Sequence, residues 1–234
     1  MGVCMKVLIN FAGILIVFPF FNVSLLSATG GVKMSEKEIK LPEPRYESEI
    51  SVEKAILNRR SIRSYVNEPL KLEEISQLLW SAQGITDKER NLRSAPSAGA
   101  LYPLEIYVVA GNVTSLEDGI YRYDPLNHGI VESKEGDYRN DLSLSALGQF
   151  CVRDGAVDIV IAAVYDRITK KYGERGIKYT YMEAGHAAQN VYLQAEALSL
   201  GTVVVGAFMD DKVKEVIGMR EEETPLYILP VGRK

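Results

Sequence analysis

The apolar and polar positions divide the chain into an uncharged leader and a longer region with the periods of folded elements. Between Lys6 and Lys33 no residue is charged, which is typical of a signal peptide or an N-terminal membrane anchor. Further along, the apolar residues recur at the spacings of helices and strands. We therefore expect a leader at residues 1–33, an extended, proline-bearing lead-in at 34–50 and one folded domain at 51–234.

A second interpretation removes the leader, because Met34 opens a stretch, MSEKEIKLPEPRY, that resembles the start of a soluble protein. The residues before it, Gly30 to Lys33, can be encoded by DNA that contains a ribosome-binding sequence. Translation from Met34 would give a cytoplasmic protein, whereas a translated leader would anchor or export the chain. Both interpretations stay open, and N-terminal sequencing of the native protein separates them.

Two amphipathic helices are predicted early in the folded domain. Ser51 is a suitable N-cap for a helix over SVEKAILNR, with Ile56 and Leu57 on its inner face. A second helix follows Pro69 and ends at Gly84. Its apolar stripe consists of Leu72, Ile75, Leu78 and Leu79.

Three more helices are predicted in the second half of the chain. The stretch DYRNDLSLSALGQ has a helical pattern, and DDKVKEVIG forms a short helix capped at Asp210. A long helix covers roughly residues 179–199, with small residues on most of its surface and few charges. A helix that is apolar nearly all round is buried, so we expect this one inside the structure.

Strands are predicted where short apolar runs lie between turn signals. EIYVVAG, GIYRYD and HGIVES read as strands, with DPLNHG as the turn between the last two. VDIVIAAVYD is a continuous apolar run, which indicates a central strand covered on both faces. TVVVGAF and PLYILPVGRK are the other two predicted strands. The irregular order of helices and strands, with an antiparallel-looking middle, predicts an α+β fold.

Composition and charge narrow the possible functions. Of the 234 residues, 47% are hydrophobic and 25% are charged, as in a globular domain, and the net charge of -4 argues against a nucleic-acid partner. Cys4 lies outside the folded domain, so no disulfide with Cys151 is expected. The two histidines, His128 and His186, are far apart, so no metal site is expected either.

The stretch RRSIRSY concentrates positive charge at the end of the first helix. Guanidinium groups match phosphate geometry and a serine hydroxyl adds a short hydrogen bond. Arg59, Arg60, Ser61 and Arg63 are therefore candidates for a phosphate site. The alternative is that arginines at a helix end serve solvation and the helix dipole.

Three further stretches are weak signals alone but agree with one another. SAPSAGALYP, residues 94–103, is a loop of small residues that allows close approach of a ligand to the backbone. GAF, residues 206–208, can present a backbone N–H to a flat ligand, and Arg233 adds a basic tip near the end of the last strand. The alternatives are a plain connection, a strand-ending glycine and a charged terminus. Together these stretches favour a ligand with a phosphate and a flat ring.

These motifs, in this order, resemble the nitroreductase-like FMN flavoproteins and, within them, the SagB-type (thiazole/oxazole-type) dehydrogenases. The similarity covers about residues 51–234. The resemblance implies that FMN is bound by Arg59, Arg60, Ser61, Arg63, Pro96, Ser97, Ala98, Gly99, Gly206, Ala207 and Arg233. Lys171 and Tyr172 resemble a Lys-Tyr pair implicated in azoline oxidation, which implies a catalytic role, and Glu183 and His186 of EAGH also fit the subgroup.

The resemblance also implies an architecture and an activity. It implies a central, mostly antiparallel sheet surrounded by helices, in an intertwined homodimer with the long buried helix at the interface. The implied activity is that of an FMN-dependent oxidoreductase, which passes hydride between a nicotinamide (NADH or NADPH) or an organic small-molecule substrate and a second acceptor. The alternatives are a flavin-binding protein without turnover and a membrane-tethered interaction protein.

Two departures from the family pattern bear on the substrate. Nitroreductases of the usual type carry an Asn and a Gln after the Pro-Ser loop, where this chain has Ala100 to Tyr102. Gly206 stands where some relatives have Glu. Both departures argue against a nitroaromatic substrate. No G-x-G-x-x-G motif follows a predicted strand, so a nicotinamide is expected to bind transiently in the cleft beside the flavin.

Overall fold

The computed structural model describes residues 37–234, so the leader and the alternative start at Met34 lie outside the described residues. The described part has an α+β fold built on a seven-stranded sheet in which every neighbouring pair is antiparallel. The prediction of a central antiparallel sheet is confirmed. In spatial order the strands are β1 (Glu38–Lys40), β8 (Gly129–Glu135), β7 (Gly119–Asp124), β5 (Leu104–Ala110), β9 (Val157–Val164), β11 (Glu223–Arg233) and β10 (Leu200–Thr202).

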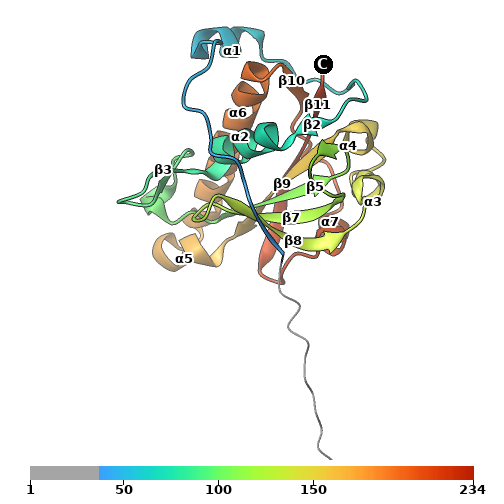
Figure 1. The fold of residues 1–234 in the computed structure, drawn as a ribbon. Coiled ribbons are helices and arrows are strands. Elements are labelled where there is room, and N and C mark those ends of the chain that lie inside the picture. Colours follow the sequence, from blue (N-terminus) through green and yellow to red (C-terminus); the bar gives the residue numbers. More distant parts are fainter. Residues whose placement is uncertain (1–36) are drawn as a thin grey trace, which may run out of the picture. The chain divides into compact units, whose positions relative to one another are not determined.

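Helices cover both faces of this sheet, as Figure 1 shows. They are α1 (Val52–Asn58), α2 (Leu72–Gln83), α3 (Arg139–Ser145), α4 (Phe150–Asp154), α5 (Asp166–Tyr172), α6 (Arg175–Ala197) and α7 (Asp210–Ile217). Two small strand pairs lie outside the main sheet, β2 (Leu70–Lys71) with β6 (Val113–Thr114) and β3 (Ile85–Asp87) with β4 (Leu92–Arg93). None of the helices in residues 37–234 is long and apolar enough to span a bilayer.

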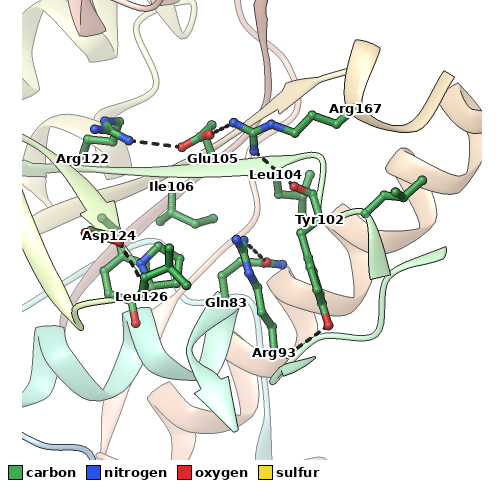
Figure 2. Close-up of a pocket in the computed structure, with 13 residues that line it drawn as sticks. Gln83, Arg93, Tyr102, Leu104, Glu105, Ile106, Arg122, Asp124, Leu126 and Arg167 are labelled. Carbon is green, nitrogen blue, oxygen red and sulfur yellow. Dashed lines mark hydrogen bonds and ion pairs between the residues drawn. The ribbon is translucent and has the colours of Figure 1, made fainter. Parts of the chain in front are cut away.

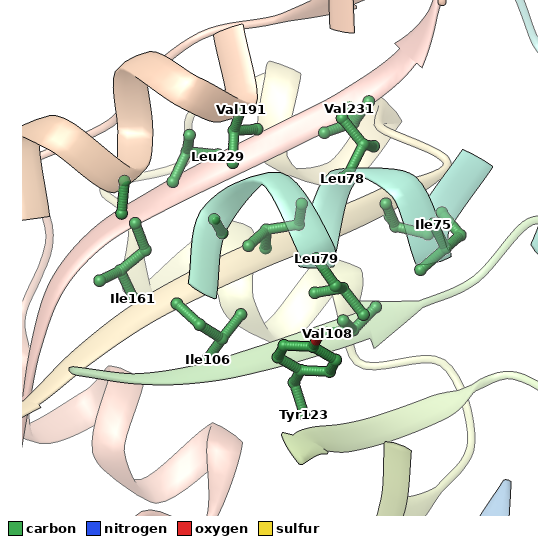
Figure 3. Packing of buried hydrophobic residues seen from close by; sticks show 14 of the residues in the cluster. Ile75, Leu78, Leu79, Ile106, Val108, Tyr123, Ile161, Val191, Leu229 and Val231 are labelled. Atoms are coloured by element: carbon green, nitrogen blue, oxygen red, sulfur yellow. The ribbon is translucent and has the colours of Figure 1, made fainter. Parts of the chain in front are cut away.

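The core lies on the two faces of the central strands, because successive side chains of a strand point to opposite faces. Ile106 and Val108 of β5 pack against α2 and α6 on one face (Figure 3). Tyr107 and Val109, between and after them, pack against α3, α4 and α7 on the other face. Every residue of β9 is buried, so the prediction of a central, doubly covered strand is confirmed.

The first helix, α1, has the predicted N-cap, but the residues that it buries are not the predicted ones. The Ser51 hydroxyl accepts a hydrogen bond from the backbone N–H of Lys54 at 3.2 Å, which confirms the predicted N-cap. Ile56 and Leu57, expected to face inward, are instead 57% and 65% exposed. Ala55 is the buried residue of α1, because this short helix contacts the rest of the subunit along a narrow strip.

The long helix α6 differs from its prediction in extent and in burial. It begins at Arg175, and one stripe of small side chains packs into the core, including Ala184, Ala187 and Ala188. In a single chain α6 is not buried all round, since Tyr181 and Met182 are more than half exposed; burial of this helix at a dimer interface stays a prediction. Small residues allow close packing but do not require it on every face.

Three local predictions are corrected by backbone geometry. TVVVGAF was predicted to be a strand, but only its first residue, Thr202, lies in one, at the end of β10. Val205 forms an isolated bridge to Ile228 of β11. The N-cap of α7 is Met209, and Asp210 is the first helical residue. The stretch DYRNDLSLSALGQ does not form one helix, because Leu147 and Gly148 both have positive φ, 59° and 73°, after the end of α3.

Candidate functional site

The RRSIRSY segment lies against the end of the sheet formed by β10 and β11. The N–H of Ile62 donates to the carbonyl of Thr202 at 2.9 Å, and the N–H of Val66 donates to the carbonyl of Arg233 at 3.0 Å. The segment approaches so closely that a Cβ on Gly232 would lie 2.7 Å from the Cβ of Tyr65. Backbone contacts and a glycine therefore fix the position of the basic residues.

The side chains of this segment divide between a structural role and free positive charge. The guanidinium of Arg60 donates to the carbonyls of Leu57 and Arg59 at 3.0 and 2.8 Å, so it serves the end of α1. Arg59 lies over the ring of Tyr192, 5.1 Å from its centre, and Arg63 is exposed. Within residues 37–234 neither Arg59 nor Arg63 has a carboxylate partner, so the charge of both is available to an anion.

Tyr192 contacts both Arg59 and Ser61 of the basic segment. Sequence analysis did not identify this residue. Its hydroxyl oxygen lies 3.0 Å from the hydroxyl of Ser61 and accepts a hydrogen bond from the N–H of Val204 at 2.8 Å. Tyr192 thereby joins α6 to the basic segment and to the chain that leads into Gly206. An aromatic residue on an amphipathic helix gives no sign of such contacts in the sequence.

Arg233 is placed near this segment but is already paired. Its guanidinium donates to both carboxylate oxygens of Glu74 in α2, at 2.7 and 2.8 Å. A two-pronged pair of this kind is strong and directional. Arg233 therefore anchors the last strand to α2 in this structure, whereas the sequence-based expectation assigned it to a phosphate.

The Pro-Ser loop of residues 94–103 has an unusual backbone. Gly99, Ala100 and Tyr102 all have positive φ, at 64°, 54° and 47°. The Ser97 hydroxyl accepts a hydrogen bond from the N–H of Tyr102 at 2.9 Å, which closes the turn. Pro96, Gly99 and Ala100 are exposed, and Ser97 and Ala98 are half-buried, so the loop exposes a surface of small residues.

The structure brings Lys171 and Tyr172 onto this loop. A Cβ on Gly99 would lie 2.7 Å from the hydroxyl of Tyr172 and 2.9 Å from the Nζ of Lys171. Both side chains therefore meet the loop at the one residue that has no side chain of its own. An amine and a phenol next to a ligand-facing loop can bind a substrate or hold a proton at a defined point.

A buried carboxyl group lies behind the loop. Glu183 of α6 is 1% exposed, and neither of its carboxylate oxygens has a hydrogen-bond partner among the described residues. Burial raises the pKa of Glu183 to about 7, although Ser97, Arg93 and Gln83 lie near enough to lower it. No hydrogen bond of good geometry links Ser97 or Gln83 to Glu183 in this part of the chain. His186, the other polar residue of EAGH, is exposed.

The two groups of candidate residues lie on different sides of α6. Asn190 donates to the carbonyls of Ser81 and Ser94, on the side of the Pro-Ser loop. Tyr192, two residues later, points to the basic segment, and at 3.6 residues per turn the two side chains leave the helix about 200° apart.

Gly206 and Ala207, the remaining candidate residues, follow the bridge at Val205. Gly206 borders a hollow together with Tyr181 and Ala184. The carbonyl of Ala207 accepts a hydrogen bond from the side chain of Gln149 at 2.9 Å.

Comparison with known proteins shows what this chain is similar to. The family model described as "Nitroreductase family" matches residues 56–233. The Methanocaldococcus jannaschii protein MJ1384, which is named as a nitroreductase, is 46% identical over 197 residues, covering 84% of this chain and 96% of that protein. A crystal structure from Ralstonia eutropha, titled as a nitroreductase, has a TM-score of 0.75 at 30% identity and covers 86% of this chain and 91% of the other.

More distant relatives have named functions. The microcin B17-processing protein McbC of Escherichia coli is 27% identical over 210 residues, with 84% of this chain and 76% of McbC covered. An FMN reductase (NADPH) of Bacillus subtilis is 27% identical over 186 residues, with 76% and 63% covered. The family match spans more than three quarters of the chain, the sheet and helices agree with solved members, and the chain belongs to the nitroreductase family.

Proposed function

We propose that this protein is an FMN-dependent oxidoreductase that acts on a small organic substrate, with a reduced nicotinamide or that substrate as the hydride donor. Membership of the nitroreductase family makes it a flavin oxidoreductase by homology. The observation that carries the finer assignment is the unpaired charge of Arg59 and Arg63 beside the linked hydroxyls of Ser61 and Tyr192. Such a group of donors suits a phosphate.

The described residues fit FMN in chemistry. Arg59, Ser61 and Arg63 would hold the phosphate, with Tyr192 fixing Ser61. The flat ring would be met by the small-residue surface of the Pro-Ser loop and by the backbone around Gly206, where an added Cβ would meet no atom closer than 3.6 Å. FMN, when bound, accepts and returns a hydride; the protein's part is to bind and orient it.

The proposed site is completed by a second copy of the chain. The residues proposed to bind the phosphate and the Pro-Ser loop lie on different sides of α6, which suits an FMN that is held between two subunits. The exposed apolar residues of α1 and α6, Ile56, Leu57, Tyr181 and Met182, supply a surface for such a partner. We therefore infer a homodimer with FMN between subunits.

Lys171 and Tyr172 are assigned to the substrate. Their position at Gly99 puts an amine and a phenol beside the loop that would face the flavin ring. We infer that they orient the substrate and move a proton at its reacting atom. We infer that the organic substrate gives up a hydride from a C–H bond, as the resemblance to the SagB-type dehydrogenases implies.

The visible absorption spectrum of the purified protein tests this proposal. A flavin spectrum that bleaches anaerobically with NADH or NADPH would support a nicotinamide-linked oxidoreductase. A flavin that bleaches with neither would point to the organic substrate as donor or to a carrier without turnover. A colourless protein that does not take up added FMN would overturn the proposal.

A further inference from the structure

A cavity of about 370 Å³ lies beside the Pro-Ser loop, between β5, β7 and α5 (Figure 2). The proposed flavin site makes no use of it. Its lining combines charged and apolar side chains, among them Arg93 of β4, Gln83 at the end of α2, and Tyr102. A volume near 300 Å³ or above is typical of pockets that hold small molecules.

Arg93 lines this cavity without a counter-ion. Its guanidinium lies over the ring of Tyr102, 4.6 Å from the centre, and donates one hydrogen bond to the side-chain oxygen of Gln83 at 3.0 Å. Burial lowers the pKa of Arg93, and within residues 37–234 no carboxylate lies within ion-pair distance of it. A partly buried cation without a partner is costly, so an anion is the expected complement.

The other arginines around the cavity have an ion-pair partner, but they share it. Arg167 and Arg122 both pair with Glu105, the latter at 3.8 Å, and Arg220 reaches the same carboxylate at 3.4 Å. Asp124 accepts hydrogen bonds from the N–H of Leu126 and the side chain of Asn127, at 3.0 and 2.7 Å. Glu183 approaches Arg93 from α6, at a distance too long for an ion pair. Among the described lining residues three guanidinium groups (Arg93, Arg122 and Arg167) face two carboxylates (Glu105 and Asp124), so the lining carries a net charge of +1, and Arg93 is the guanidinium without an ion pair.

This charge balance selects a monoanion. A phosphate dianion would exceed the net charge of +1 and would meet the carboxylates of Glu105 and Asp124 in the same cavity. A carboxylate carries a single charge and matches the planar fork of a guanidinium. The remaining lining is largely apolar and would cover a short hydrocarbon chain or ring; it consists of Leu101, Leu104, Ile106, Tyr123, Pro125 and Leu126.

We propose that this cavity binds a small monocarboxylate with an apolar tail, and that Arg93 pairs with its carboxylate group. The site lies next to the proposed flavin loop. Tyr102 covers Arg93 and also holds Ser97 through its backbone N–H, and α5 carries both Arg167 of the cavity and Lys171 of the loop. The occupied cavity therefore stiffens the loop against which a substrate would bind. The proposal does not depend on the presence of FMN.

Isothermal titration of the full-length protein with hexanoate and with neutral hexanamide tests the proposal. We expect hexanoate to bind and hexanamide to bind at least about tenfold more weakly, since it cannot pair with a guanidinium. In Arg93→Gln this preference for the acid should disappear. Arg90→Gln is the matched control, because Arg90 lies in the turn between β3 and β4, is exposed and pairs with Asp87; this variant should bind hexanoate like the original protein.

A second variant covers the case in which Arg93→Gln does not fold. Arg93→Lys keeps the charge but loses the fork, so it should bind hexanoate several-fold more weakly than the original protein and still prefer it to hexanamide. The proposal is overturned if hexanoate does not bind, if hexanamide binds equally well, or if the Arg93 variants bind hexanoate unchanged. Inorganic phosphate that binds more tightly than hexanoate in an Arg93-dependent manner would overturn the assignment to a monocarboxylate.

Discussion

The hydroxyl of Tyr172 lies so close to Gly99 that a methyl group on this glycine would be 2.7 Å from it. The contact joins the end of α5 to the Pro-Ser loop across more than seventy residues of sequence. Gly99 is thus required twice, by its positive φ of 64° and by the side chains above it.

Replacement of this glycine tests whether the contact matters. Gly99→Ala should destabilise the protein by about 1–2 kcal/mol through its left-handed backbone and should also push Tyr172 and Lys171 off the loop. Urea unfolding measures the first effect, and turnover of the flavin-loaded protein measures the second. Gly148→Ala is the control, because Gly148 has a φ of 73° and no atom within 4 Å of an added Cβ. Equal turnover losses in both variants would remove the special role of the Tyr172 contact.

The free charge at Arg63 predicts a loss of FMN in Arg63→Ala. A charge-assisted contact to phosphate is worth roughly 1.5–3 kcal/mol, so FMN affinity should fall roughly ten- to a hundredfold. The flavin content of the purified variant and the fluorescence of released FMN measure the effect. Arg60→Ala is the comparison within the same segment, since Arg60 bonds to carbonyls at the end of α1 and should leave FMN affinity nearly unchanged. An Arg63 variant that keeps its flavin would refute the phosphate assignment.

Tyr192 is predicted to stabilise the fold and to position the residues that are proposed to bind the FMN phosphate. Tyr192→Phe leaves the Val204 N–H without its acceptor and Ser61 without its partner, which should cost about 1–3 kcal/mol of unfolding free energy. FMN affinity should fall with it. Tyr179→Phe on the same helix is the control, because the Tyr179 hydroxyl has no hydrogen bond within the described chain. Unchanged stability in Tyr192→Phe would show that water replaces the lost hydroxyl.

The buried carboxyl of Glu183 predicts a pH-dependent stability. Its ordinary pKa is 4.5, and burial raises the folded-state pKa to about 7. Between these pH values the folded chain binds more protons at this group than the unfolded chain, so the unfolding free energy falls as pH rises. The fall amounts to about 3 kcal/mol and is complete above pH 7.

Glu183→Gln should remove this part of the pH dependence, because the amide does not ionise. Urea unfolding at pH 5, 6, 7 and 8 compares the two proteins, and the variant should gain stability relative to the original as the pH rises. Parallel curves for the two proteins would mean that Glu183 ionises normally and is reached by water.

Local patterns in the sequence predicted the framework of the fold. The apolar run of β9 marked the centre of the sheet, since only a strand covered on both faces is apolar without alternation. Ser51 marked the start of α1 because an N-cap acts within its own turn. The basic segment and the small-residue loop were also recognised, because their composition is unusual by itself.

Contacts between distant segments were not predictable in this way. Tyr192 meets Ser61 across 131 residues, and Arg233 pairs with Glu74 across 159, and neither residue differs in type from ordinary surface residues. The exposure of Ile56 and Leu57 could not be predicted either, since an apolar stripe does not say whether its partner is the same chain or another.

The last strand also determines when the candidate site can form. β11 lies between β9 and β10, and its carbonyl at Arg233 accepts a hydrogen bond from the N–H of Val66. Contacts that span most of a chain form slowly, because the loop they close must be ordered first. β11 is synthesised after every other described element. The early segment from Arg59 to Tyr65 can therefore reach its final position only once β11 has been made. A nascent chain that lacks this strand does not yet have the contacts that place the proposed phosphate site, so we expect cofactor binding to follow folding of the complete sheet.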